Sequence, residues 1–178
     1  TNDASGYLGY AYFPSSAANS VIDGVVMLHS AIGGRNNGNG VYDQGRTLAH
    51  EIGHYLGLHH TFNGGTCDNT YSTADLLVDT PPQEDPDYGS TPSTACGVDS
   101  AIENLMNYSV DSAMYTFSAE QTNRMICGLV NYRSDTHSSS ASGTVTSFGA
   151  GSPLTVHGLT NGNSYSCSVV AANSSGSS

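Results

Sequence analysis

Two histidines separated by three residues are followed, after a glycine, by a third histidine. The segment reads His50-Glu51-Ile-Gly-His54-Tyr-Leu-Gly57-Leu-His59-His60. On a helix, side chains four positions apart share a face at about 5–6 Å, so His50 and His54 can offer two imidazoles to one metal ion. Gly57 allows the left-handed turn that ends such a helix. The chain can then fold back and bring His60 to the metal as a third ligand.

This pattern predicts a catalytic zinc ion, because three protein ligands leave the fourth position open for water. Glu51 is rotated about 100° from His50 around the helix axis. It can therefore take a proton from the water, whose pKa zinc lowers to about 7. The alternative is a helix with two unrelated histidines, but the extended spacing favours the metal. His59 is the rival third ligand; the spacing selects His60, and we expect His59 beside the site or in solvent.

The motif must lie on a helix, which we predict over 44–56 with Asp43 as its N-cap. Residues 7–13 are predicted to be extended. Residues 23–31, apolar and β-branched at their centre, are predicted to form a strand. We expect a compact α/β core with a short mixed sheet, in which residues 23–31 form the edge strand.

Residues 61–100 hold most of the Pro, Asp and Thr and are predicted to form a long ordered loop. Ser118 and Gln121 have the spacing of a capping box, which predicts a helix over 119–132. Residues 134–151 are rich in Ser and Gly and are predicted to be a linker. Residues 152–178 alternate around Asn161-Gly162, which predicts β structure.

The composition limits the classes of partner. Fifteen Asp and Glu face four Arg and no Lys, for a net charge of −11. This argues against nucleic acid and against anionic membranes, and it fits a secreted, extracellular protein. No apolar run reaches the ~18 residues of a membrane span. No signal peptide is visible at Thr1, so we expect the mature form.

The four cysteines are Cys67, Cys96, Cys127 and Cys167, which allow three pairings. The segment between the first two is loop-like and contains no CxxC pair. We therefore favour a disulfide over a metal site there, which implies an oxidising compartment.

The zinc motif and the segment Asn104-Leu-Met106-Asn-Tyr108-Ser resemble the pappalysin family of metzincin peptidases. The resemblance covers about residues 8–133. We therefore expect the catalytic domain to comprise residues 1–133. It implies an α/β (α+β) metzincin-like fold with a reduced upper sheet, an active-site helix, a Met-turn and a C-terminal helix, followed by a small β appendage. It also implies secreted zinc-dependent endopeptidase activity on a peptide or protein substrate. Met106 would lie beneath the zinc and Tyr108 would help to bind the transition state.

The resemblance also implies calcium in the long loop. Carboxylates with backbone carbonyls suit Ca²⁺, and Asp75 and Asp79 are the favoured ligands, with Asp68 as a third candidate. The alternative is solvated loop charges. The acidic run at 84–87 is expected to be a solvated surface, and His29, His137 and His157 fall outside any motif.

The sequence departs from the family at its start, because only 49 residues precede His50. The upper sheet is expected to be reduced or completed by a separate N-terminal segment. Met114 stands where relatives that cleave before Arg or Lys place an acidic residue in the S1′ pocket, which favours an uncharged residue after the scissile bond. Asp111 is close enough in sequence to leave a basic preference open.

The tail over 152–178 resembles the closing half of a fibronectin type III module. Its Cys167 would lack the usual partner, for which Cys127 is a candidate. We expect a monomer. Two other functions stay open: a non-catalytic zinc-binding adhesion module, against which Glu51 argues, and an inactive fragment of a larger protease, which the short N-terminus favours.

Overall fold

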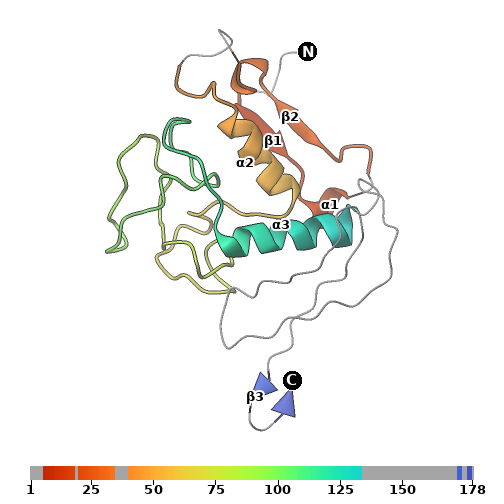
Figure 1. Cartoon of the computed structure of the whole chain (residues 1–178), viewed down its shortest axis with the longest axis vertical. Coiled ribbons are helices and arrows are strands. Elements are labelled where there is room, and N and C mark those ends of the chain that lie inside the picture. The colour runs from red at the N-terminus through yellow and green to blue at the C-terminus, as the bar shows by residue number, and fades with distance from the viewer. Residues whose placement is uncertain (1–5, 19, 35–39, 134–171, 174–175, 178) are drawn as a thin grey trace.

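The computed structural model describes residues 6–18, 20–34, 40–133, 172–173 and 176–177. The helices are α1 (Pro14–Ala17), α2 (Arg46–Tyr55) and α3 (Ala119–Tyr132), with a 3-10 turn η1 (His29–Ala31). The strands are β1 (Gly9–Ala11), β2 (Val25–Met27), β3 (Ala172–Asn173) and β4 (Gly176–Ser177). Figure 1 shows α2 between the β1–β2 sheet and the long loop, with α3 across its lower end. No helix in the described ranges has the length and apolar character of a membrane span.

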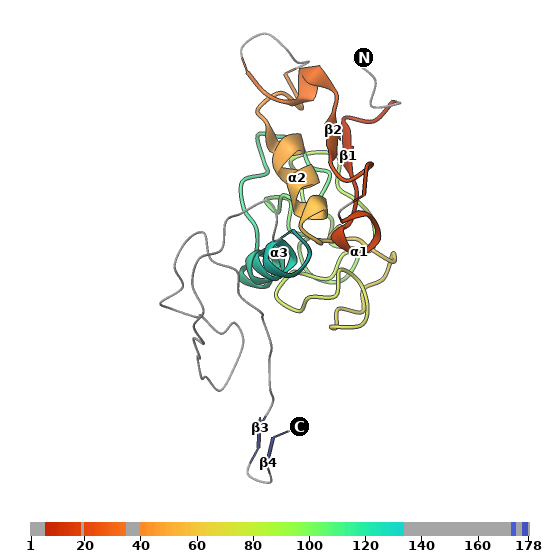
Figure 2. The same cartoon turned by 90° about the vertical axis from the view of Figure 1, so that its right-hand side faces the viewer.

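Strands β1 and β2 pair antiparallel, with Gly9 opposite Met27 and Ala11 opposite Val25. Figure 2 shows this pair standing along one side of α2. The strand predicted over 23–31 is shorter than expected. The backbone amides of Ala31 and Ile32 donate within η1, to Leu28 and His29, and so cannot take part in a strand ladder.

Helix α2 begins at Arg46, two residues later than predicted, and the prediction that Asp43 is its N-cap is wrong. Gly45 is the N-cap and adopts a φ of +83°. The carboxylate of Asp43, which precedes this left-handed turn, accepts from the amide of Gly40 instead. Asp111 takes over the capping role: its Oδ2 accepts from the amides of Gln44 at 2.7 Å and Arg46 at 3.3 Å.

Helix α3 has the predicted bounds and the predicted capping box. The Ser118 hydroxyl accepts from the amide of Gln121, whose side-chain oxygen accepts from the amide of Ser118. The helix packs closely on the end of α2 at Gly128, where an added β-carbon would lie 2.1 Å from the carbonyl oxygen of Leu56. A larger residue at 128 would therefore force the two helices apart.

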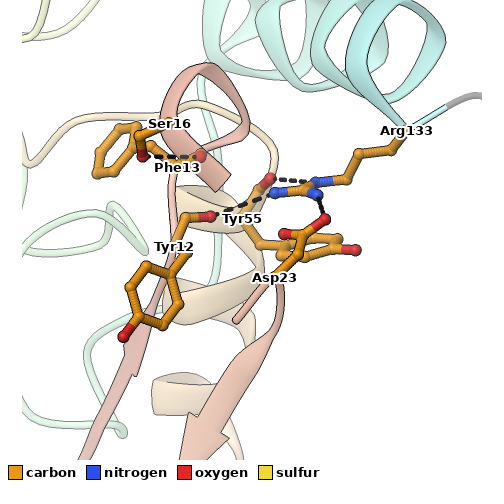
Figure 3. Close-up of polar contacts among 6 residues, drawn as sticks. All are labelled: Tyr12, Phe13, Ser16, Asp23, Tyr55 and Arg133. Carbon is orange, nitrogen blue, oxygen red and sulfur yellow. Dashed lines mark hydrogen bonds and ion pairs between the residues drawn. The ribbon is translucent and has the colours of Figure 1, made fainter. Parts of the chain in front are cut away.

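Arg133 connects the end of α3 to the end of α2 and to the β1–β2 sheet (Figure 3). Its side chain is 1% exposed and forms an ion pair with Asp23. The guanidinium donates to the carbonyls of Tyr55 at 2.8 Å and Tyr12 at 3.2 Å, and its carbon lies 3.4 Å from the centroid of the Tyr55 ring. A buried cation is tolerated when its donors are matched in this way, so Arg133 fixes how these elements meet.

The predicted long loop over 61–100 is confirmed, because it contains neither helix nor strand and only one isolated bridge, between Thr66 and Gln83. The predicted disulfide between Cys67 and Cys96 closes it, with α-carbons 5.3 Å apart. The predicted linker at 134–151 and Cys167 lie outside the described residues, as does most of the segment 152–178. In that segment, the short strands β3 and β4 pair antiparallel.

Candidate zinc site

The end of α2 brings the third histidine to the first two. Gly57 adopts a φ of +98°. Its amide donates to the carbonyl of His54 at 2.9 Å, and the amide of Leu58 donates to that of Gly53 at 2.9 Å. These two bonds form a Schellman cap, which needs a left-handed residue at this position. The chain reverses there and returns His60 to the face of α2 that carries His50 and His54.

The three Nε2 atoms converge on one point. They are 3.1 Å apart between His50 and His54, 3.2 Å between His50 and His60, and 2.9 Å between His54 and His60. In the part of the chain that the structure describes, this is the only group of three or more potential metal-ligating His, Cys, Asp or Glu side chains. The arrangement confirms His60 rather than His59 as the third member.

In His50 and His54, hydrogen bonds show that the ring nitrogen Nδ1 carries the proton. The Nδ1 of His50 donates to the carbonyl of Leu105 and that of His54 to the carbonyl of Leu58, both at 2.7 Å. A carbonyl only accepts, so Nδ1 carries the proton and Nε2 of the neutral ring carries a lone pair. Burial and the adjacent His54 lower the pKa of His50 to about 3. Burial and the neighbouring histidines lower the pKa of His60 to about 2.

Neutral rings with converging lone pairs fit a cation. Three lone pairs about 3 Å apart repel one another unless a positive ion lies between them. Zinc bonds of about 2.0–2.1 Å in a tetrahedron would separate the nitrogens by about 3.3–3.4 Å, close to the observed spacing. Nitrogen ligands in this number and geometry suit Zn²⁺, whereas Ca²⁺ and Mg²⁺ prefer oxygen.

Glu51 lies on α2 directly after the first ligand and is 6% exposed. Strand β1 packs on it through Gly9, where an added β-carbon would come within 2.8 Å of Cγ and 3.1 Å of Oε1 of Glu51. Burial raises the pKa of Glu51 to about 7. The carboxyl group can therefore exchange a proton near neutral pH, as a general base requires. Sequence reasoning did not single out Gly9, because no local pattern marks a contact between a strand and this side chain.

Aromatic rings surround the histidines. The Tyr108 ring centroid lies 4.8 Å from that of His60 and 5.6 Å from that of His50, and its side chain is 36% exposed. Phe62 stacks on His60 at 4.7 Å with an interplanar angle of 9°. Phe13 contacts His54 at 5.4 Å and His59 at 5.0 Å. Phe13 and Phe62 were not predicted; the proximity of Phe62 to His60 in sequence is the only signal of its role.

The segment that follows the long loop packs against α2 at the histidines, through Leu105 and Met106. Met106 is fully buried, and an added β-carbon at Gly53 of α2 would lie 2.5 Å from its sulfur. The carbonyl of Met106 accepts from the amide of Thr61 at 3.2 Å. The preceding carbonyl, of Leu105, accepts from His50. Met106 thus lies against the helix between its two histidines.

The loop aspartates are engaged in hydrogen bonds within the protein. Asp75, 1% exposed, accepts from the amide of Leu77 at 3.1 Å and the hydroxyl of Thr80 at 2.9 Å, and burial raises its pKa. Asp79 accepts from the hydroxyl of Ser118 and the amide of Glu120, at 2.7 and 2.8 Å. Asp68 is exposed. Among the described residues these three carboxylates form no common cluster with the geometry of a metal site.

Two other predicted residues have specific surroundings. Met114 is 3% exposed and Asp111 1% exposed, so both lie below the surface. Oδ1 of Asp111 makes no hydrogen bond with the described residues.

The expectation that the acidic run 84–87 is entirely solvated is wrong for Asp87, which is 8% exposed. Four polar groups of the loop and the following segment hydrogen-bond to its carboxylate and so replace solvent.

Comparisons with known proteins agree with this site. The chain is 44% identical over 132 residues to extracellular metalloprotease 1 of Coccidioides posadasii, covering 69% of this chain and 45% of that protein. It is 39% identical over 141 residues to an extracellular metalloprotease of Colletotrichum graminicola, covering 74% and 48%. The chain thus spans about half the length of the curated relatives that it matches.

A solved structure shows the same fold. Mature mirolysin of Tannerella forsythia, in complex with a cleaved peptide, superposes with a TM-score of 0.59 at 35% sequence identity, covering 68% of this chain and 47% of that one. The fold is therefore a mirolysin-like metzincin fold. Residues 3–130 match the model of the peptidase M43 family, described as pregnancy-associated plasma protein-A. The resemblance to the pappalysins is thereby confirmed, and this chain belongs to the peptidase M43 family.

Proposed function

We propose that this chain is the catalytic part of a secreted zinc-dependent endopeptidase, in which His50, His54 and His60 hold the metal and Glu51 is the general base. The observation that carries the proposal is the convergence of three Nε2 atoms within 3.2 Å beside a buried carboxyl group. When bound, zinc supplies a Lewis acid that polarises a carbonyl group and lowers the pKa of water.

The chain's own residues handle the protons. The carboxylate of Glu51 accepts a proton from the attacking water and returns it to the leaving amine, for which a pKa of about 7 is suited. The phenol of Tyr108, 36% exposed and in ring contact with His60, donates a hydrogen bond to the carbonyl oxygen as negative charge develops there. Met106 acts as the Met-turn residue beneath the ligands.

The substrate is an extended segment of a peptide or protein. Strand β1, whose Gly9 lies against Glu51, pairs with β2 on one side, and the described residues place no strand on its other side. A peptide adding to this edge would gain backbone hydrogen bonds that do not depend on its sequence. Such pairing would let the enzyme accept many sequences and discriminate among them through side-chain pockets.

Secretion and domain order complete the proposal. The disulfide implies an oxidising compartment, and the fungal relatives are named extracellular. We place the catalytic domain at 1–133, the linker at 134–151 and a fibronectin-like segment at 152–178. A separate N-terminal segment would complete the upper sheet, and the protein would act as a monomer.

Calcium in the long loop is a separate proposal, supported by the carboxylates of Asp68, Asp75 and Asp79 close together in sequence. Two of these carboxylates already accept hydrogen bonds, so calcium would have to replace some of these bonds. Elemental analysis tests it: zinc and calcium in equal amounts support it, and zinc alone after dialysis against calcium refutes it.

A non-catalytic zinc module and an inactive fragment are the competing functions, the second because the relatives are about twice as long. The deciding experiment measures zinc content and casein hydrolysis with and without a chelator. One zinc per chain together with chelator-sensitive hydrolysis is the expected result. Bound zinc without hydrolysis would support either competing function, and restored hydrolysis after adding an N-terminal segment would single out the fragment.

A further inference from the structure

A buried carboxylate lies at the centre of a hydrogen-bond network in the long loop. Oδ2 of Asp87 accepts from the hydroxyl of Ser100 at 2.6 Å and from the side-chain amides of Gln83 and Asn107, each at 3.0 Å. Its Oδ1 accepts from the backbone amide of Ser93 at 3.1 Å. Hydrogen bonds to an ionised acceptor are stronger than those between neutral groups. The carboxylate therefore orients all four donors.

One branch of the network leads to Tyr108. Asn107 is fully buried and donates from Nδ2 to Asp87 at 3.0 Å and to the carbonyl of Ala101 at 3.2 Å, so its Oδ1 is turned the other way. That oxygen accepts from the backbone amide of Tyr108 at 2.8 Å and from the amide of Asp87 at 3.2 Å. A flipped Asn107 would direct two donors at these amides. Asp87 thus fixes the backbone of the residue proposed to contact the transition state.

The other branch leads to His60. Gln83 is 2% exposed, and its Nε2 donates to the carbonyl of Asp85 at 2.8 Å, to Asp87 at 3.0 Å and to the side-chain oxygen of Asn107 at 3.1 Å. Its Oε1 is thereby turned toward the hydroxyl of Thr61, from which it accepts at 2.8 Å. Thr61 is 1% exposed and directly follows the third histidine. Gln83 therefore joins the segment that carries His60 to the segment that carries Tyr108.

We propose that Asp87 is a positioning residue of the zinc site, which holds His60 in place through Gln83 and Tyr108 in place through Asn107. The part that concerns Tyr108 rests on the proposed function, whereas the part that concerns His60 requires only that zinc binds. A buried network of this kind gives one arrangement when every member is satisfied and loses that uniqueness when one member is changed.

The test compares Asp87→Asn with Asp85→Asn, the same change at an exposed side chain two residues away. At 87 the new amide would face the donors of Ser100, Gln83 and Asn107. We expect zinc to bind about 10–100-fold more weakly in competition with a chelator, the range found when groups behind metal ligands are altered. The visible absorption bands of the Co²⁺-loaded protein, which report ligand geometry, should shift. The kcat should fall about tenfold or more with KM little changed, because Tyr108 acts in the transition state.

Thr61→Val isolates the His60 branch, because it removes one hydroxyl without changing the shape of the side chain. It should alter zinc affinity and the cobalt spectrum in the same direction as Asp87→Asn. Unchanged zinc affinity and cobalt spectrum in a folded Asp87→Asn protein would overturn the proposal. If Asp87→Asn fails to fold, the same null result in Thr61→Val overturns it. A wild-type protein that binds zinc but cleaves nothing would refute the proposed function, and the metal readouts would still decide this inference.

Discussion

Gly53 has no side chain, and Met106 occupies the space that this leaves on α2. A β-carbon at Gly53 would lie 2.5 Å from the sulfur of Met106 and 3.4 Å from its Cε. Gly53 is on the helix between His50 and His54, at a position where alanine would ordinarily be favoured. The glycine is explained by this contact, which lets a buried thioether pack directly under the histidine-bearing helix.

Gly53→Ala should therefore destabilise the protein, although the same change in an exposed helix stabilises by about 1 kcal/mol. Overpacking in a filled core costs about 1–3 kcal/mol, and we expect the loss to be accompanied by weaker zinc binding. Urea denaturation and chelator competition measure both effects. Gly24→Ala is the matched control, since a β-carbon there meets nothing within 4 Å.

A double-mutant cycle with Met106→Ala identifies the cause of that loss. If the sulfur is responsible, Gly53→Ala should cost much less in the Met106→Ala background, so the two effects should not add. Strict additivity would show that the two residues do not contact each other in the way that the structure indicates.

Glu51→Gln should retain zinc and lose about 10²–10⁴-fold in hydrolysis, because the three imidazoles stay and the general base is removed. Zinc analysis and peptide cleavage are measured on the same sample. The matched control is Glu84→Gln, at an exposed carboxylate outside the site. Near wild-type activity in Glu51→Gln would rule out the proposed mechanism.

The features predicted correctly from sequence depend on residues close together in the chain. The spacing of His50, His54 and His60 and the glycine at 57 specify a helix, its Schellman cap and a returning ligand within eleven residues. The capping box of α3 needs only positions 118 and 121. Such local patterns limit the backbone to few conformations, so they can be interpreted without knowing the rest of the fold.

The errors concern residues whose partners are distant in sequence. Asp111 replaces Asp43 as the group that caps α2, across 67 positions from Gln44. Asp87 belongs to an acidic run that looks solvated, yet it accepts from Asn107, 20 positions away. Gly9 contacts Glu51 only because β1 lies against α2. A sequence pattern does not specify which loop meets which helix, so these roles required the tertiary structure.

Loss of the Cys67–Cys96 disulfide should lower the free energy of unfolding. The bridge spans 29 positions, for which the chain-entropy model gives about 3–4 kcal/mol. The double variant with both cysteines changed to serine should unfold at lower urea concentration, and reductant should affect the wild type but not the variant. Equal stability of wild type and variant without reductant would show that the loop is held by its hydrogen bonds alone.

Removal of the metal should lower the melting temperature, because the Nε2 lone pairs of His50, His54 and His60 then face one another without a cation. Zinc at a hundredfold excess over Kd stabilises by about 2.7 kcal/mol, which corresponds to roughly 5–10 °C for a domain of this size. Differential scanning calorimetry with a chelator, followed by zinc, measures the shift. His60→Ala should show a much smaller response, and a chelator-independent melting temperature in wild type would contradict the site.

Cleavage should favour an apolar or uncharged residue after the scissile bond. We propose that the S1′ pocket lies between α2 and the segment 109–115, with Met114 in its wall. Oδ2 of Asp111 accepts from the amides of Gln44 and Arg46, which engages this carboxylate as a helix cap and leaves it less available to a basic side chain. A pocket that fits on the scale of methylene groups discriminates only about 10–200-fold, so the preference should be broad.

A peptide library with every residue at that position measures the preference, with Asp111→Asn as the comparison. In our interpretation Asp111→Asn lowers thermal stability, because the cap of α2 is weakened, and leaves the order of preferred residues unchanged. A dominant Arg or Lys in wild type that disappears in Asp111→Asn would show that the second oxygen, Oδ1, faces the substrate. That oxygen is buried and makes no hydrogen bond with the described residues, so the two outcomes separate a structural carboxylate from one that selects the substrate.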